Sequence, residues 1–275
     1  MSYLLLTDVI SALHCDATPN FSTTELSIKM PLSSHRFRTI YALIHSHVSL
    51  PTDVRSKEDG LLLLTALLND IIYMQRCYPT DTVPSVGHTA SISSSNAPLR
   101  NPYAPLSSLS ERSRLNAALN AALDRWKEIF QPTTEKVILA LFYFCKLQVT
   151  CPDIWELPRL AGYMTCLDSI NNPSPPSRDG GRRIEIPDEA IDFAWLVLDS
   201  CNMELETLGN KLAIWLPVIL FHSALVIWQR LRFRSPADTK YGTLKILSMF
   251  KNEIAQLPWA CCAKMQTTLG RLMNE

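Results

Sequence analysis

Two histidines, His45 and His47, stand two positions apart in the stretch "HSH" and are candidates for metal chemistry. Imidazole nitrogens bind zinc, copper and iron, but a chelate requires both rings to reach the same ion. The apolar spacing around them predicts a helix, in which side chains two positions apart point about 200° away from each other. An extended segment would let the rings share an ion, whereas a helix does not. We therefore interpret the two histidines as unrelated helix residues.

Cysteine chemistry is the next candidate. No pair has Cys-x-x-Cys spacing, and no Cys or His follows Cys261–Cys262 at zinc-ligand spacing. His14 precedes Cys15, but adjacent residues point to different faces of a helix or strand, so they do not form a nucleophile and its base. Because most cysteines lie in apolar runs, we expect reduced, buried thiols in an intracellular compartment. The eight cysteines are Cys15, Cys77, Cys145, Cys151, Cys166, Cys201, Cys261 and Cys262.

Magnesium chemistry is suggested by "NDIIYMQR", which begins at Asn69. In terpene-cyclase-like enzymes, carboxylates on facing helices hold magnesium around a diphosphate. The chain has no Asp-Asp-x-x-Asp cluster, and Asn69–Asp70 lacks the serine and glutamate that should follow. A Gly-x-Ser-x-Gly elbow and glycine-rich phosphate loops are also missing from the sequence. We predict no enzymatic activity and no catalytic, cofactor-binding or metal-ligating residues, with an all-α metal enzyme of terpene-cyclase-like type as the alternative.

The balance of basic and acidic residues gives little support for binding to nucleic acid. Lysine plus arginine and aspartate plus glutamate number 26 each, so the chain lacks the basic excess that phosphate binding requires. The densest basic run, "QRLRFR" from Gln229 to Arg234, follows an apolar helix, and cations stabilise the C-terminal end of a helix. We expect no direct contact between this chain and nucleic acid.

The elements that position these residues are predicted to be helical. Hydrophobic residues make up 47% of the 275 residues, and eight glycines are too few for a sheet with many turns. Apolar residues recur at spacings of three and four, without sustained alternation or a repeated unit. The sequence therefore predicts an all-α fold, an irregular multi-helix bundle of about nine helices. Its expected helical segments are 35–50, 58–78, 110–130, 133–150, 187–209, 211–234, 237–257 and 259–274.

Two stretches rich in proline and serine interrupt this pattern. Residues 79–107 and 171–187 cannot supply a core, so we predict a disordered loop at the first and a flexible loop at the second. The rest of residues 1–275 is expected to form a single helical domain. Between Cys145 and Tyr163, Pro152 is predicted to end one helix and Pro158 to force a second break. Trp155 is expected to fill the corner between the packed helices and, with Trp215, to form part of the core.

Residues 212–228 are the one candidate for a membrane span. The segment is just under the ~20 residues that a spanning helix needs, and it contains Pro217 and His222. Basic residues flank both of its ends, so the charge bias that would orient a membrane helix is weak. We interpret the segment as a central buried helix and keep a single-span membrane protein as an alternative.

The ordered set of motifs resembles the fungal-specific transcription factor domain, the "middle homology" region of fungal zinc-finger and zinc-cluster regulators. "FSTTEL" followed by "MP", within residues 6–31, is similar to the family's proline-containing loop with its "FS-x-x-EL" stretch. The further segments that carry the resemblance are "EDGLLLLTALLNDI" (58–71), "ALDRWKEIF" (122–130), "CKLQVTCPDIWELPRLAGY" (145–163), "WLPVILFHSALVIWQRLR" (215–232) and "PWACCAKMQTTLGRL" (258–272).

The resemblance implies a nuclear, helical regulatory domain of a fungal RNA polymerase II transcription factor. Its partners would be other transcription proteins or a second copy of the chain, and it would contact neither DNA nor membrane. Family members carry a zinc module before this region, and Met1 falls where the family domain is already under way. We therefore expect an N-terminally truncated domain that needs no cofactor, with zinc confined to a module that precedes it.

Overall fold

The computed structural model describes residues 2–46, 48–77, 109–163, 184–202, 213–232 and 236–274. These residues confirm the all-α prediction, because they form ten α-helices and no strand beyond one isolated bridge between Lys29 and Arg36. The helices are α1 (Ser2–His14), α2 (Phe37–His45), α3 (Lys57–Cys77), α4 (Leu109–Phe130), α5 (Lys136–Thr150), α6 (Leu157–Leu160), α8 (Asp188–Asn202), α9 (Leu216–Arg232), α10 (Pro236–Ala255) and α11 (Cys261–Leu272).

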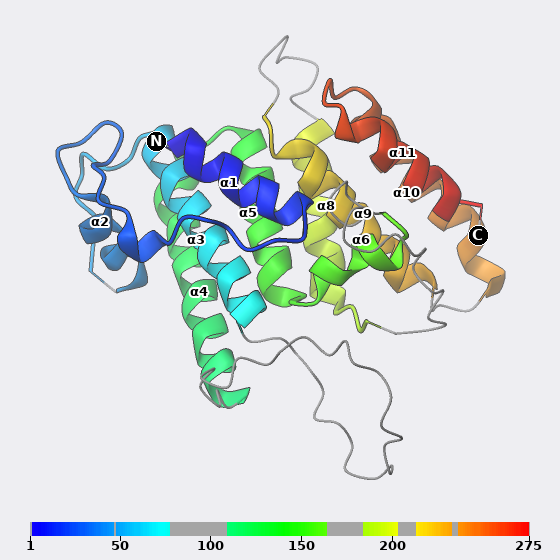
Figure 1. Cartoon of the computed structure of the whole chain (residues 1–275), viewed down its shortest axis with the longest axis horizontal. Helices are drawn as coiled ribbons and strands as arrows, with labels where there is room; N and C mark the ends of the chain where they lie inside the picture. Colours follow the sequence, from blue (N-terminus) through cyan, green and yellow to red (C-terminus); the bar gives the residue numbers. More distant parts are fainter. Residues whose placement is uncertain are drawn as a thin grey trace.

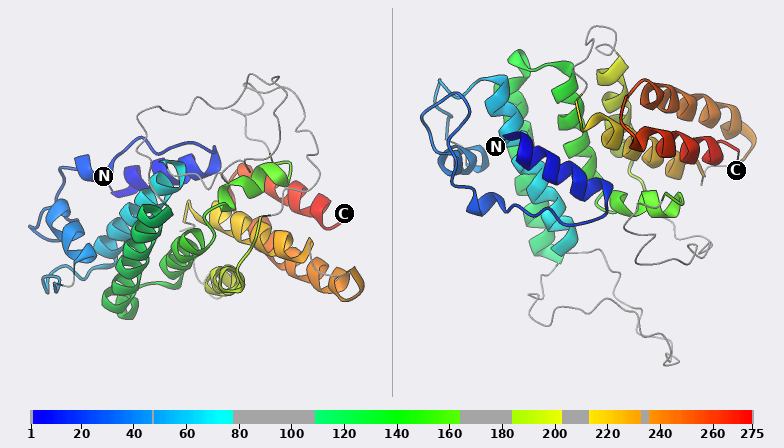
Figure 2. Two further views of the ribbon diagram at one scale, coloured as in Figure 1. Left: turned by 90° about the horizontal axis from the view of Figure 1, so that it is seen from below. Right: turned by 45° about the horizontal axis from the view of Figure 1, so that its top comes forward.

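Helix α5 lies in the middle of the molecule, with α1–α4 on one side and α8–α11 on the other (Figure 1). The N-terminus lies on the side of α1–α4, while the hairpin of α10 and α11 forms the opposite end of the molecule (Figure 2). Helices α5 and α9 are buried on nearly every face, as their continuous apolar sequences require. The indole of Trp215, the residue before α9, donates a hydrogen bond to the Val137 carbonyl in the first turn of α5 (3.2 Å).

Trp126 anchors the contact between α3, α4 and α5. Its indole nitrogen donates a 2.7 Å hydrogen bond to the Gly60 carbonyl, and its ring stacks on Phe142 with 5.5 Å between centroids. Phe130 covers the other side of Gly60, where a Cβ atom would lie 2.9 Å from the phenyl ring. A glycine at this position therefore lets α3 and α4 approach closely. Trp126 is fully buried, and Trp215 is also buried, as predicted.

The segment between α5 and α6 differs from the prediction at two residues. Pro152 does follow the end of α5, but Pro158 lies in the first turn of α6 and begins a helix where we predicted a break. The first turn accepts proline because its amides have no partner within the helix. Trp155 is only partly buried, and the Arg76 guanidinium lies over its ring at 4.6 Å. Ile154 and Leu157, three residues apart, fill the core position that we assigned to this tryptophan.

The two predicted loops are described to different extents. Residues 79–107 lie outside the described ranges, as do 171–183 of the second loop. The last four residues of that second range, 184–187, pack on the bundle, because Ile184 and Ile186 are buried. Arg230 of α9 donates a hydrogen bond to the Ile186 carbonyl (3.1 Å) and pairs with Asp188. This end of the predicted flexible loop is therefore a structured lead into α8.

The membrane alternative has limited support in the described helices. None of them is by itself long and apolar enough to cross a bilayer, although α5 and the Ile154–Leu160 segment pass that test as a pair bent by 102°. Helix α9 begins at Leu216, within the candidate range 212–228, and is buried against other helices. Leu212 itself lies outside the described ranges.

Candidate functional site

A buried carboxylate on α3, Asp70, is the centre of the most connected polar cluster. Its two oxygens accept hydrogen bonds from the Thr23 hydroxyl (2.5 Å) and the Tyr41 hydroxyl (2.7 Å). Thr23 belongs to a 3₁₀ turn, Thr23–Glu25, and Tyr41 lies on α2. The cluster therefore joins three elements that are far apart in the sequence.

Neighbouring residues of α3 extend this cluster along the preceding chain. Asn69 donates a hydrogen bond to the Phe21 carbonyl (3.1 Å), and the Tyr73 hydroxyl donates one to the Pro19 carbonyl (2.8 Å). These bonds supply partners to backbone carbonyls of a segment that forms neither helix nor strand at these residues. Asn69, Asp70 and Tyr73 thus hold the chain between α1 and α2 against α3.

Burial controls the titration of this cluster. It raises the pKa of Asp70, although the hydrogen bonds from Thr23 and Tyr41 act in the opposite direction. Burial, and then the Asp70 charge, raise the pKa of Tyr41 well above its usual value. His45 lies at 4.8 Å from the Tyr41 ring, and burial lowers its pKa despite the nearby Asp70 carboxylate. The raised pKa of Tyr41 keeps its phenol protonated at neutral pH, so it remains a hydrogen-bond donor to Asp70.

The arrangement is better suited to holding a loop than to binding magnesium. Both Asp70 oxygens already accept hydrogen bonds from protein groups, and Asn69 donates to a backbone carbonyl. Within the part of the chain that the structure describes, no three His, Cys, Asp or Glu side chains converge in a way that could hold a metal ion. His45 lies in the cluster, whereas His47 is outside the described residues. The terpene-cyclase-like alternative gains no support from these contacts.

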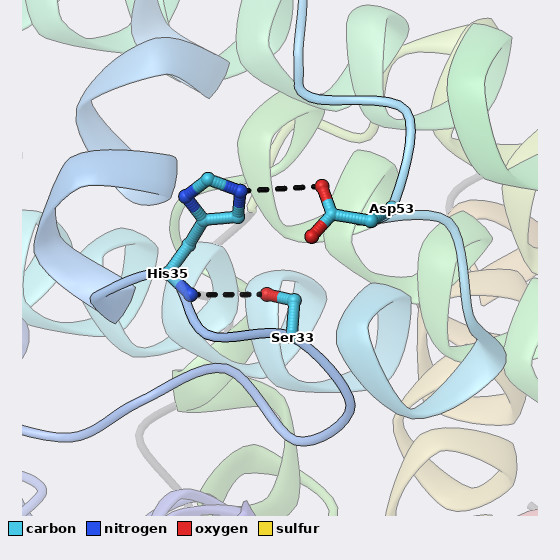
Figure 3. Close-up of polar contacts among 3 residues, drawn as sticks. All are labelled: Ser33, His35 and Asp53. Atoms are coloured by element: carbon cyan, nitrogen blue, oxygen red, sulfur yellow. Dashed lines mark hydrogen bonds and ion pairs between the residues drawn. The ribbon is translucent and has the colours of Figure 1, made fainter.

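A second pair, His35 and Asp53, lies on the loops that flank α2 (Figure 3). The His35 Nε2 atom is 3.2 Å from Asp53 Oδ1, and both side chains are partly exposed. The Ser33 hydroxyl lies nearby but accepts a hydrogen bond from the His35 backbone amide (3.4 Å), not from its ring. The three residues therefore do not form the serine–histidine–carboxylate relay that their types suggest.

His14 and His222 lie in a third cluster, where α1, α6, α9 and α11 meet. His14 packs edge-on to Tyr163, and the Lys264 ammonium lies 5.5 Å from the same tyrosine ring. His222, on α9, is buried, and its Nδ1 atom is 2.9 Å from the Val218 carbonyl. Burial lowers the pKa of His222 to about 4, so this imidazole is neutral at physiological pH. The contacts are those of helix packing, and the His14 ring faces Tyr163.

Sequence reasoning missed the partners in these clusters. Asp70 is separated from Tyr41 by 29 positions and from Thr23 by 47, and His35 is 18 positions from Asp53. The one local signal was the polar pair Asn69–Asp70 inside an otherwise apolar helix. Buried polar groups require hydrogen-bond partners, so such a pair predicts a tertiary contact without naming the partner.

The structure also shows what surrounds the basic run Gln229–Arg234 and the cysteines. Arg230 pairs with Asp188, and the Arg232 guanidinium lies 5.4 Å from the Trp228 ring, while Arg234 is outside the described residues. Six cysteines of the described ranges form no disulfide, namely Cys15, Cys145, Cys151, Cys201, Cys261 and Cys262, and all but Cys15 and Cys261 are buried. Burial raises the pKa of the Cys151 thiol to about 12, which makes it inert as a nucleophile at neutral pH.

The fold and these clusters define an all-α protein whose described polar groups chiefly join one helix or loop to another. Comparison with known proteins adds no assignment, because no family model, curated protein or solved structure matches the chain. The resemblance to fungal transcription regulators therefore stays a prediction from the quoted motifs.

Proposed function

We propose that the chain is the regulatory domain of a fungal RNA polymerase II transcription factor that works in the nucleus through protein contacts. In this proposal it neither contacts DNA nor catalyses a reaction. Zinc would belong to a separate DNA-binding module and not to this chain. The motif resemblance supports the transcriptional part, and the equal numbers of basic and acidic residues support contacts with proteins over contacts with phosphate.

Exposed apolar side chains carry the proposal of protein contacts. Tyr3 and Leu4 begin α1 and are 72% and 59% exposed, while Leu32 is 68% exposed and Val48 57%. The start of α1 and the segments that flank α2 lie together at one end of the molecule (Figures 1 and 2). Exposed apolar side chains that adjoin one another on a surface are typical of sites where proteins bind one another, and we propose that these side chains belong to such a site. We assign this end, defined by Tyr3, Leu4, Leu32 and Val48, to a partner protein of the transcription apparatus.

A reporter assay tests the proposal. The chain is fused to an unrelated DNA-binding module in fungal cells, and transcription from a promoter carrying that module's sites is measured. A triple variant, Leu4→Gln, Leu32→Gln and Val48→Gln, removes apolar groups from the proposed surface. Leu196→Gln, at a similarly apolar but separate position on α8 that is 37% exposed, is the matched control.

The proposal predicts that the fused wild-type chain changes reporter output, that the triple variant loses the change, and that Leu196→Gln keeps it. Circular dichroism establishes that each variant retains its helices. Light scattering on the purified chain then distinguishes between two possible kinds of partner. A dimer that the triple variant dissociates would identify a second copy as the partner, in place of another transcription protein. A fused wild-type chain without effect on the reporter would contradict the proposal.

A further inference from the structure

A short hairpin at residues 28–37, the basic hairpin, precedes α2 and presents two cations side by side. Lys29 and Arg36 lie opposite each other in its isolated antiparallel bridge. On one side of the bridge the Met30 amide donates a 2.9 Å hydrogen bond to the His35 carbonyl, and a second backbone bond of the same length flanks the other side. Lys29 and Arg36 are therefore a non-hydrogen-bonded pair, the arrangement in which opposite side chains lie closest.

This pair places like charges next to each other without an acid to separate them. Like charges directly opposite each other on paired strands are destabilising. Both side chains are exposed, and the exposed Arg38 follows in the first turn of α2. No acid among the described residues forms an ion pair with any of these three cations. The basic hairpin thus retains a repulsion that a bound anionic group would relieve.

The local sequence concentrates positive charge in a chain that is neutral as a whole. Residues 26–52 contain these three cations and no aspartate or glutamate. The next acid along the chain, Asp53, lies 3.2 Å from the ring of His35, which points away from the hairpin toward it (Figure 3). The acid before the hairpin, Glu25, is exposed and forms no ion pair with Lys29. An anionic partner therefore meets positive charge at this surface.

An apolar side chain lies between the two strands of the basic hairpin. Leu32 is 68% exposed, and Tyr3, Leu4 and Val48 add exposed apolar groups at the same end of the molecule (Figures 1 and 2). A phosphate backbone supplies negative charge with little apolar surface, whereas a protein segment that mixes acidic and apolar residues supplies both. The mixture of cations and apolar groups favours such a segment over nucleic acid.

We propose that the basic hairpin, together with Arg38, docks an acidic segment of the partner protein that also carries apolar side chains. A carboxylate between Lys29 and Arg36 relieves their repulsion and accepts hydrogen bonds from both, and a guanidinium holds a carboxylate through two parallel bonds. An apolar side chain of the same segment packs on Leu32 and loses its contact with water. This inference rests on the proposed function, because it names the chemistry of the partner that the contact surface receives.

The test is the binding of a fluorescent peptide to the full chain, measured by anisotropy. The probe is a synthetic peptide in which aspartate and leucine alternate. One control peptide has asparagine in place of aspartate, and the other has serine in place of leucine. We expect the wild-type chain to bind the probe more tightly than either control, and its affinity for the probe to fall as salt is added. Equal binding of the probe and one of the controls would overturn the proposal, because one of the two chemistries would then be irrelevant.

Two pairs of variants locate the binding site. Lys29→Gln with Arg36→Gln should weaken binding of the probe by about 5- to 30-fold and reduce its salt dependence. The matched control, Arg159→Gln with Lys245→Gln, removes the same charge from exposed positions elsewhere and should bind as wild type does. Leu32→Gln should weaken binding by up to about 10-fold, while Leu196→Gln should not. Equal losses in a variant and its control would overturn the assignment to the hairpin.

Stability and a rival ligand provide two further outcomes. Because Lys29→Gln with Arg36→Gln removes a repulsion, the double variant should unfold at no lower a urea concentration than wild type. A lower midpoint would show that these cations stabilise the fold and would contradict the repulsion. A labelled DNA duplex is titrated beside the probe. If the duplex binds more tightly than the probe and the double variant weakens it, the hairpin is a phosphate site and the proposal is wrong.

The peptide assay uses the purified chain and no promoter, so its result is separate from that of the reporter assay. Binding of the probe that depends on the hairpin, with a silent reporter, would contradict the transcriptional role and leave the docking site in place. Absent or variant-insensitive binding, with an active reporter, would overturn the docking site alone.

Discussion

His222 should make the protein less stable in mild acid than at neutral pH. The imidazole is buried in α9, lies 6.0 Å from the Phe144 ring, and is approached by the positive charge of Arg76 and by His14. Burial, and then these charges, hold its pKa near 4 against an ordinary value of 6.5. The unfolded chain therefore binds a proton at a higher pH than the folded chain. The stability that this group contributes is present above pH 6.5 and is lost as the pH falls toward 4.

The size of the effect follows from the two pKa values. Between pH 7 and pH 4.5, a shift from 6.5 to about 4 corresponds to a loss of about 2.4 kcal/mol in the free energy of unfolding. His222→Leu removes the titrating group and keeps an apolar side chain in the core. The Val218 carbonyl still accepts the helical amide at position 222, so no buried acceptor is orphaned.

Urea unfolding of both proteins at pH 7 and pH 4.5 measures this prediction. We expect wild type to lose about 2.4 kcal/mol more than His222→Leu over this interval. The difference between the two losses cancels the contribution of every other titrating group that the substitution leaves unchanged. Equal losses in the two proteins would show that His222 is not a buried neutral imidazole, and would refute the packing of α9 against α5 described above.

Three further substitutions test individual contacts by urea unfolding at pH 7. Trp126→Phe removes the hydrogen bond to the Gly60 carbonyl and should cost about 1–3 kcal/mol, whereas an unchanged free energy would argue against that bond. Gly60→Ala places a methyl group against Phe130 and should also cost about 1–3 kcal/mol; a more stable variant would contradict the close approach of α3 and α4. Tyr41→Phe removes a donor to Asp70 and should cost about 1.5–3 kcal/mol, whereas an unchanged free energy of unfolding would argue against the role of this cluster in joining α2 to α3.

The helices could be predicted because their signals are local. Apolar spacing in α4 and the continuous apolar sequences of α5 and α9 depend on residues within one or two turns of each other. The predicted burial of Trp215 was correct for the same reason, since its surroundings in sequence are apolar throughout.

The polar clusters could not be predicted because their partners come from distant segments. Asp70 had a local signal in its apolar helix, but nothing in the sequence named Thr23 or Tyr41 as its donors. Trp155 was placed wrongly because adjacent residues of a short 3₁₀ turn point in different directions, and here Ile154 faces the core in place of the indole. Tertiary packing decides which residue of the turn faces inward, and Ile154 and Leu157 together occupy the core at this position.

The reporter comparison tests the central claim of protein-mediated regulation most directly. The wild-type chain, tethered to a promoter by an unrelated DNA-binding module, is measured beside the folded Leu4→Gln, Leu32→Gln and Val48→Gln triple variant. We predict a change in transcription with wild type that the triple variant loses and that Leu196→Gln retains. A tethered wild-type chain that leaves transcription unchanged, or a triple variant as active as wild type, would contradict the account.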